Sequence, residues 1–114
     1  MTAEASFIKS GAAPSFIVRG KAVHRLQVGS APIGIIRTVQ TQATPFLLKE
    51  GDTVVMISDG ILQNDPECEW LSEYLTGAGE LTPEEIVYKI CLHASEADTH
   101  DDCSAVALRI LSAA

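Results

Sequence analysis

The sequence is poor in basic residues and in aromatic residues, has three cysteines and has no long apolar run. Eight lysines and arginines stand against fifteen acidic residues, a net charge of −7, which disfavours nucleic acid because a basic footprint is missing. No apolar segment approaches the roughly 20 residues that cross a bilayer, and no signal peptide opens the chain. An odd number of widely spaced cysteines favours a reduced, cytoplasmic protein.

What is present suffices for one folded domain. Hydrophobic residues make up 46% of the 114 positions, and this length fits a single folding unit. The chain has no internal repeat, linker or low-complexity stretch. The acidic balance suits a cation or a basic partner, and it is also an ordinary means of staying soluble.

The first half of the chain predicts short strands separated by turns. The run at 53–57 is one of the most apolar in the chain and predicts a strand buried on both faces. The tight turn at Gly20 and Lys21 predicts an antiparallel hairpin. The expected strands cover residues 4–9, 15–19, 22–27, 38–44 and 53–57.

The second half predicts two helices. Asp65 and Pro66 form a typical helix start, with a capping carboxylate before proline at the first helical position, and Gly77 is a suitable stop. Thr82 and Glu85 have the spacing of a capping box at the start of the second helix. The apolar faces are expected to comprise Trp70, Leu71, Tyr74 and Leu75 in the first helix and Ile86, Val87, Ile90, Cys91 and Ala94 in the second.

A closing strand at 104–111 is predicted from the alternation of its side chains. Strands followed by helices and a last strand indicate an α+β fold, an antiparallel β-sheet meander with two helices packed on one face. One domain over residues 1–114 is therefore expected.

Carboxylates flank two of these strands. Asp59 follows the strand at 53–57, while Asp101 and Asp102 precede the closing strand. If the two strands pair in antiparallel fashion, these acids meet at one edge of the sheet, and a divalent cation would relieve their repulsion. Oxygen ligands favour Mg²⁺ or Mn²⁺ over zinc. Alternatively, Asp59 is a turn residue before Gly60 and the later pair lies in a solvated loop.

A zinc site is a second alternative for the same region. It would use Cys91, His93, His100 and Cys103. The irregular spacing of these residues and the place of Cys91 on an apolar helix face disfavour it.

A resemblance to a known family bears on these alternatives. "GDTVVMISDGI", followed some forty residues later by "DDCSAVALRI", resembles the type 2C metal-dependent protein serine/threonine phosphatases. More narrowly, "EASFIKSGAAPSFIVRG", "APIGI" and "LKEGDTVVMISDGI" are similar to the stage II sporulation protein E family. The likeness covers essentially the whole chain in order. It implies half of a type 2C α/β sandwich, the C-terminal half of the domain.

The resemblance also implies a site. Asp59 and Asp101 match metal ligands of the family. From the residues themselves, Ser58 and Gly60 are expected to shape the turn around Asp59 and orient its carboxylate, and Asp102 is expected to lie next to the ligands. The implied cofactors are two Mn²⁺ or Mg²⁺ ions, which activate a water for attack on phosphoserine or phosphothreonine. An upstream aspartate-glycine pair of the family has no counterpart here. We therefore expect a fragment that binds metal weakly and has little or no activity alone.

For a parent protein, the resemblance implies a phosphorylated anti-anti-sigma factor as substrate and activation of a sporulation sigma factor. It also implies a membrane anchor at the division septum, outside this chain, with the phosphatase on the cytoplasmic side. A stress-response phosphatase of the partner-switching type and a non-catalytic interaction module of the same fold are the alternatives. Exposed sheet surface on a fragment would favour self-association.

Overall fold

The computed structural model describes residues 2–9, 13–26, 42–63, 65–96 and 102–111. These residues form an α+β fold, as expected from the sequence. Residues 38–41 of one expected strand lie outside the described part, and that strand is observed later, as β4. The elements in chain order are β1 (Thr2–Lys9), β2 (Ser15–Arg19), β3 (Ala22–Leu26), β4 (Gln42–Lys49), β5 (Thr53–Ile57), α1 (Asp59–Leu62), α2 (Glu69–Thr76), α3 (Pro83–Glu96) and β6 (Ala105–Arg109).

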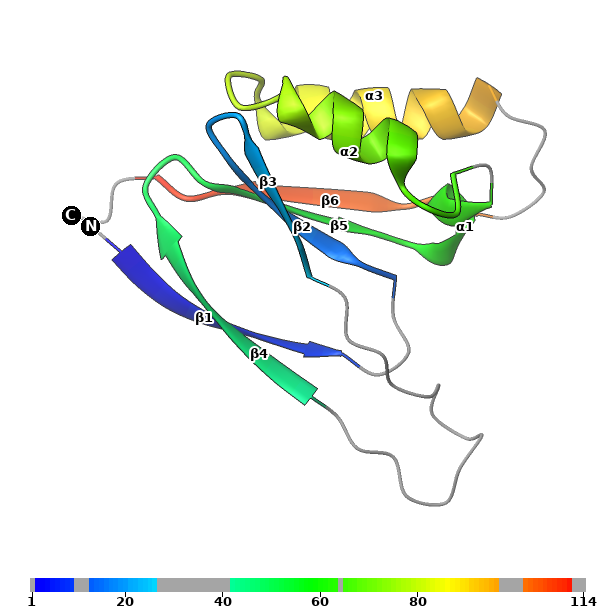
Figure 1. Cartoon of the computed structure of the whole chain (residues 1–114). Coiled ribbons are helices and arrows are strands. Elements are labelled where there is room, and N and C mark those ends of the chain that lie inside the picture. Colours follow the sequence, from blue (N-terminus) through cyan, green and yellow to red (C-terminus); the bar gives the residue numbers. More distant parts are fainter. Residues whose placement is uncertain (1, 10–12, 27–41, 64, 97–101, 112–114) are drawn as a thin grey trace, which may run out of the picture.

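The strands form two antiparallel sheets. One has the order β3-β2-β5-β6 and the other pairs β1 with β4. Figure 1 shows the β1–β4 pair on one side of the four-stranded sheet and α2 and α3 on the other. The β2–β3 hairpin is confirmed, but the order is not a simple meander, because β5 pairs with β2 and β1 pairs with β4. Since β2 and β5 carry apolar residues on both faces, they require cover on both sides, which a second sheet and a helical layer provide.

The burial of β5 agrees with the prediction for its first three residues. Thr53, Val54 and Val55 are buried. Val54 packs with Leu48 of β4 in a small cluster between the sheets. Met56, on the same face as Val54, is 36% exposed, so the expectation of burial on both faces is wrong at this end of the strand. The small cluster between the sheets includes Val54 but does not include Met56.

The start of α2 differs from the prediction. The helix begins at Glu69, because Cys68 has a left-handed backbone with φ of 56°. Asp65 and Pro66 instead open a turn that is closed by a 2.9 Å hydrogen bond from the Cys68 N–H to the Asp65 carbonyl. The Asp65 carboxylate still accepts hydrogen bonds from the Trp70 and Leu71 N–H groups, at 3.1 and 3.0 Å. Asp65 therefore caps the helix from across the turn, and Gly77 ends it as predicted.

The capping box of α3 is confirmed. The Glu85 N–H donates to the Thr82 hydroxyl and the Thr82 N–H donates to the Glu85 carboxylate, both at 3.1 Å. The predicted apolar face is buried at Ile86, Ile90 and Ala94, while its other two members are partly exposed. A well-capped helix of this length still depends on packing for its stability.

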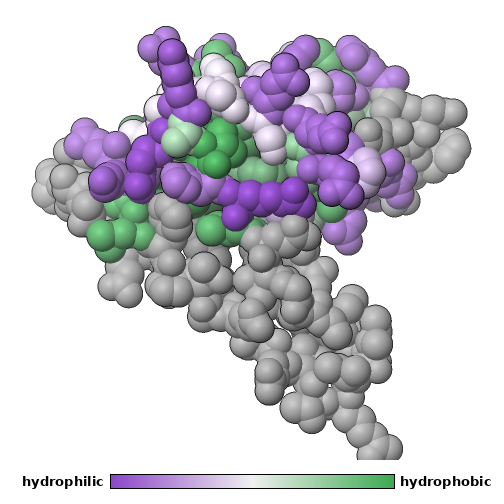
Figure 2. Space-filling view, in the orientation of Figure 1, coloured by the Kyte–Doolittle hydropathy of each residue, from purple (hydrophilic) through white to green (hydrophobic). Residues whose placement is uncertain are grey.

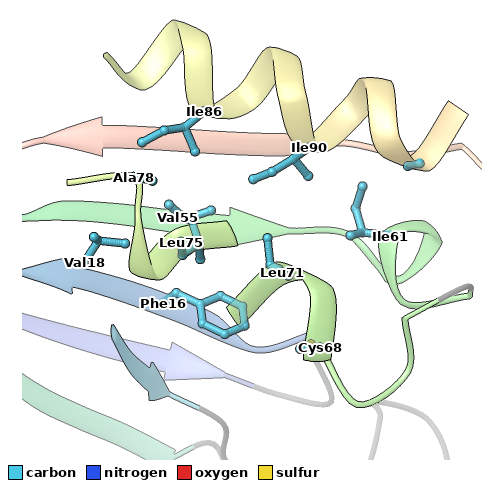
Figure 3. Packing of buried hydrophobic residues seen from close by; sticks show 11 residues of the cluster. Phe16, Val18, Val55, Ile61, Cys68, Leu71, Leu75, Ala78, Ile86 and Ile90 are labelled. Carbon is cyan, nitrogen blue, oxygen red and sulfur yellow. The ribbon is translucent and has the colours of Figure 1, made fainter. Parts of the chain in front are cut away.

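The main core lies between the four-stranded sheet and the helices (Figure 3). Each of its large side chains contributes about 1.5–3 kcal/mol by burial, so this contact holds α2 and α3 on the sheet. The members with at most 1% exposure include Phe16, Val18, Val55, Cys68, Leu71, Leu75, Ala78, Ile86 and Ile90.

The face of β6 that points away from the helices is apolar and exposed, as is Met56 beside it at the end of β5. Val106 is 48% exposed and Leu108 is 53% exposed, whereas Ala105 and Ala107 point to the core. The small alanines face the helical layer because α3 packs closely along β6. Together with Met56, these side chains form an exposed sheet surface of the kind predicted from the sequence.

The helical side has a different character. In Figure 2, hydrophilic residues cover much of this side, with a hydrophobic area between them. None of the helices in the described ranges has the length and apolar character needed to cross a membrane.

Candidate metal-binding site

The two strands that carry the candidate ligands are neighbours. β5 and β6 pair in antiparallel register, and the last pair is Ile57 with Ala105. The C-terminal end of β5 therefore meets the N-terminal start of β6, as the sequence predicts. This places the segment beginning at Ser58 beside the segment that ends at Ser104 (Figure 1).

Asp59 lies at the first position of the short helix α1, directly after β5. The turn that the sequence alternative expects before Gly60 is a single helical turn, which Asp59 opens. Ser58 is the N-cap, with extended backbone angles (φ −90°, ψ 166°). The Ile61 N–H donates to the Ser58 carbonyl at 3.1 Å, so the chain changes from strand to helix within one residue. Asp59 is exposed at this corner.

Ser58 contacts the start of β6 through two hydrogen bonds. Its N–H donates to the Ser104 carbonyl at 3.0 Å. Its hydroxyl accepts from the Ser104 N–H at 2.9 Å. These two bonds continue the contact between the strands beyond their last regular pair.

Gly60 is in close contact with the same segment. A Cβ at this buried position would overlap the carbonyl oxygen of Asp102, and it would lie 3.2 Å from the Cys103 sulfur. Only glycine, which has no side chain, allows the backbone at Asp102 to come so near. Ser58 and Gly60 thus contact residues 104 and 102 on either side of Asp59.

The carboxylates at this corner are available to a cation. Asp59 and Asp102 are exposed, and neither forms an ion pair with another described residue. Asp101 lies outside the described residues. Unpaired carboxylate oxygens are ligands that Mg²⁺ and Mn²⁺ prefer, so the donors at this edge fit such an ion. No group of three potential metal-binding side chains occurs within the described ranges, and further ligands would be water or other protein oxygens.

The zinc alternative receives no support from the residues that are described. His93 stacks on Trp70 with ring centroids 3.6 Å apart. Burial, followed by the charge of Cys103, raises the pKa of the Cys91 thiol, as burial does for a cysteine side chain packed on a helix face. His100, the fourth candidate, lies outside the described residues.

The start of β5 has a different electrostatic arrangement. Asp52, 1% exposed, accepts hydrogen bonds from the Arg19 side chain at 2.9 and 2.7 Å and from the Lys49 N–H at 2.8 Å. Burial alone raises the pKa of Asp52, but the bonds from Arg19 and Lys49 outweigh it and leave the pKa below its ordinary value of 3.8. The Asp52 carboxylate is therefore held by structural hydrogen bonds, in contrast to the exposed carboxylate of Asp59 at the other end of β5.

Sequence reasoning missed Ser104. Its contribution comes from backbone atoms, which residue type does not reveal. The only signal was the strand register: once Ile57 faces Ala105, the next residue outward on each strand is Ser58 and Ser104.

Comparisons with known proteins agree with this arrangement. Two crystal structures from Bacillus subtilis superpose on most of the chain. One contains the PP2C phosphatase domain and a fragment of the regulatory domain of stage II sporulation protein E, with a TM-score of 0.82, 32% identity and coverage of 96% of this chain and 34% of that one. A manganese-presoaked crystal of the phosphatase domain gives a TM-score of 0.78 and 31% identity, covering 98% of this chain and 52% of that one. The fold is thus that of the PP2C phosphatase domain, of which this chain spans part.

The sequence relatives define the family. Stage II sporulation protein E of Bacillus subtilis is 32% identical over 115 residues, which cover 95% of this chain and 14% of that protein. The protein of that name from Priestia megaterium is 31% identical over 88 residues, which cover 74% of this chain and 15% of that protein. The family model described as stage II sporulation protein E matches residues 1–111. The chain belongs to the stage II sporulation protein E family.

Proposed function

We propose that the chain is part of a metal-dependent phosphoprotein phosphatase domain of type 2C, specific for phosphoserine or phosphothreonine. The observation that carries this proposal is the contact of the Ser58–Gly60 segment with residues 102–104. It places Asp102, which follows Asp101 in sequence, against the short helix that begins at Asp59. Membership of a family with solved PP2C phosphatase domains supports the same activity.

Asp59 and Asp101 would hold Mn²⁺ or Mg²⁺, with two ions in a complete domain. Such ions, when bound, lower the pKa of a coordinated water and offset charge on the phosphoryl oxygens. Asp59 presents its carboxylate from a corner fixed by β5. Ser58 holds this corner against Ser104 and Gly60 holds it against Asp102. The exposed carboxylate of Asp102 lies at the same edge.

The proposed substrate is a phosphorylated anti-anti-sigma factor, and its dephosphorylation would activate a sporulation sigma factor. The support is family membership, since the Bacillus subtilis relative is named a cell fate determinant. We further propose a membrane anchor at the septum in the parent protein, with this part on the cytoplasmic side. No nucleic acid is proposed as a partner, because acidic residues exceed basic ones by seven and a basic footprint for phosphates is missing.

This chain spans 14% of the Bacillus subtilis relative and 52% of a solved phosphatase domain. We propose that residues 1–114 are a partial domain with weak metal binding and little activity alone. The test compares Mn²⁺-dependent hydrolysis of a phosphoserine peptide by this chain and by a longer parent polypeptide. We expect activity in the parent and its loss in the parent with Asp59→Asn. An inactive parent would favour the non-catalytic interaction module.

Substrate identity needs a separate assay. The active parent would be offered phosphorylated anti-anti-sigma factors of the sporulation and the stress-response systems. Faster hydrolysis of the sporulation substrate supports the proposal. A preference for the stress-response substrate would favour the partner-switching alternative.

We also propose that the isolated chain associates with a second copy through the exposed face of β5 and β6. Met56, Val106 and Leu108 leave an apolar surface between 36% and 53% exposed per side chain. Burying such a surface against another copy is favourable in water.

A further inference from the structure

The hydroxyl of Ser58 replaces a backbone acceptor at the end of β5. In a regular antiparallel pair, two facing residues exchange N–H···O=C bonds in both directions. Here the Ser58 N–H donates to the Ser104 carbonyl in the usual way, but the Ser58 carbonyl accepts from Ile61 in α1. The return bond from the Ser104 N–H goes to the Ser58 hydroxyl at 2.9 Å.

This arrangement lets one residue serve two elements. The carbonyl starts helix α1 at Asp59, while the side chain keeps the start of β6 in place. Alanine or glycine at this position would retain the bond to Ile61 but would leave the Ser104 N–H to solvent. Because Ser104 is exposed, water can take over that bond, so the effect on stability is small and the effect on position is larger.

The contact also determines where Asp59 lies relative to residues 102–104. Ser58 touches Ser104, and Gly60 touches Asp102. Asp59 is therefore held at two points against a three-residue segment that begins one residue after Asp101. The Gly60 contact is steric and keeps the segments from approaching further, whereas the Ser58 bond is attractive and keeps them from separating.

We infer that Ser58 is a positioning residue for cation binding, acting by fixing the start of β6 beside Asp59 through its hydroxyl. The inference rests on the proposed function, because it concerns a cation bound at Asp59. Groups that orient metal ligands change metal affinity by about 10- to 100-fold when they are removed. Threonine retains a hydroxyl on Cβ and can make the same bond.

The experiment measures Mn²⁺ binding to the 114-residue chain by paramagnetic broadening of its backbone amide signals. The variants are Ser58→Ala and Ser58→Thr. Thr76→Ala is the matched control, because it removes an exposed hydroxyl that bonds the Ser72 carbonyl in α2. Thermal unfolding and amide hydrogen exchange at Ser104 are recorded for all of them.

We expect Mn²⁺ to broaden the amides around Asp59 and Asp102 in the wild type. Ser58→Ala should weaken the apparent affinity about 10-fold or more and speed exchange at Ser104, while Ser58→Thr and Thr76→Ala remain near wild type. Wild-type binding with equal affinity in Ser58→Ala would overturn the positioning role alone. A wild type with no broadening at Asp59 would overturn the metal site itself, and the positioning role with it.

Discussion

The imidazole ring of His93 lies parallel to the indole ring of Trp70, with an interplanar angle of 2° and ring centroids 3.6 Å apart. Tyr74 stacks on the same indole at 5.2 Å. The contact joins α3 to α2 above the core. A stacked pair of this kind contributes about 0.5–1.5 kcal/mol beyond its buried area.

Replacing His93 with alanine should therefore lower the free energy of unfolding by about 1 kcal/mol. Trp70 is the only tryptophan in the sequence, so its emission reports the contact directly and should shift to longer wavelength. Urea unfolding followed by fluorescence measures both effects. Lys89→Ala, at an exposed position one turn earlier in α3, is the control. Equal stability and unchanged emission in His93→Ala would contradict the stacking.

The ion pair of Arg19 and Asp52 should be a major local contribution to stability. Arg19→Met leaves the Asp52 carboxylate buried without its charged partner, and breaking such a pair costs about 3–5 kcal/mol. The low end is expected because the Arg19 side chain is 32% exposed. Lys21→Met, in the exposed β2–β3 turn, should change stability by less than about 0.5 kcal/mol. Denaturant unfolding at neutral pH compares the two variants.

The same pair predicts a pH dependence in acid. Because the folded pKa of Asp52 lies below its ordinary value of 3.8, the unfolded chain binds the proton more readily than the folded chain does. The stabilisation is therefore complete above the unfolded pKa and is lost as the pH falls through the folded pKa. Unfolding free energies from about pH 6 to pH 2 should converge for wild type and Asp52→Asn at the acid end. A difference between wild type and Asp52→Asn that stays constant over this pH range would refute the assignment.

Gly60 should not accept even a methyl group. In Gly60→Ala the new Cβ would overlap the Asp102 carbonyl, and relief of such overpacking typically costs about 1–3 kcal/mol. Gly77→Ala is the matched control, because its Cβ would have only one ordinary contact, 3.9 Å from the Tyr74 carbonyl. Thermal unfolding gives the stability change, and amide chemical shifts at residues 102–104 should move only in Gly60→Ala. A stable Gly60→Ala with unmoved signals would mean that the segments are further apart.

Self-association through the β5–β6 face should weaken when charge is placed on it. Leu108→Lys should shift the sedimentation profile of a concentrated sample toward monomer, because burying the new ammonium between two copies is costly. Tyr88→Lys is the control, since Tyr88 is 70% exposed on α3 instead. A wild type that stays monomeric at high concentration would rule out the proposed association.

Much of the fold could be predicted from local patterns. The capping box of Thr82 and Glu85 and the stop at Gly77 were predicted correctly, because they depend on residues near each other in sequence. The start of α2 could not be predicted, since the left-handed backbone of Cys68 is not implied by its residue type. Strand order was also beyond local patterns, because the pairing of β1 with β4 depends on how two sheets cover each other.

The carboxylates of the candidate site could be predicted from the sequence, but the contacts that hold them in place could not. Asp59 and the later acidic pair stood out because they flank apolar strands. At Ser58 the side-chain hydroxyl takes the place of the backbone carbonyl as the acceptor for Ser104. This depends on α1, a helix of four residues that is too short to show a periodic pattern in the sequence. The close approach of Asp102 to Gly60 likewise appears only once β5 and β6 are paired.

The pairing of β5 with β6 also determines when, during synthesis, the corner around Asp59 can form. Ser58 and Ser104 are 46 positions apart, and contacts between such distant positions form late because closing a long loop is entropically unfavourable. A growing polypeptide on the ribosome would display Asp59 well before β6 emerges to lie next to it. A cation bound at Asp59 as proposed would therefore be captured only after β6 has been translated, when the two sides of this corner first meet.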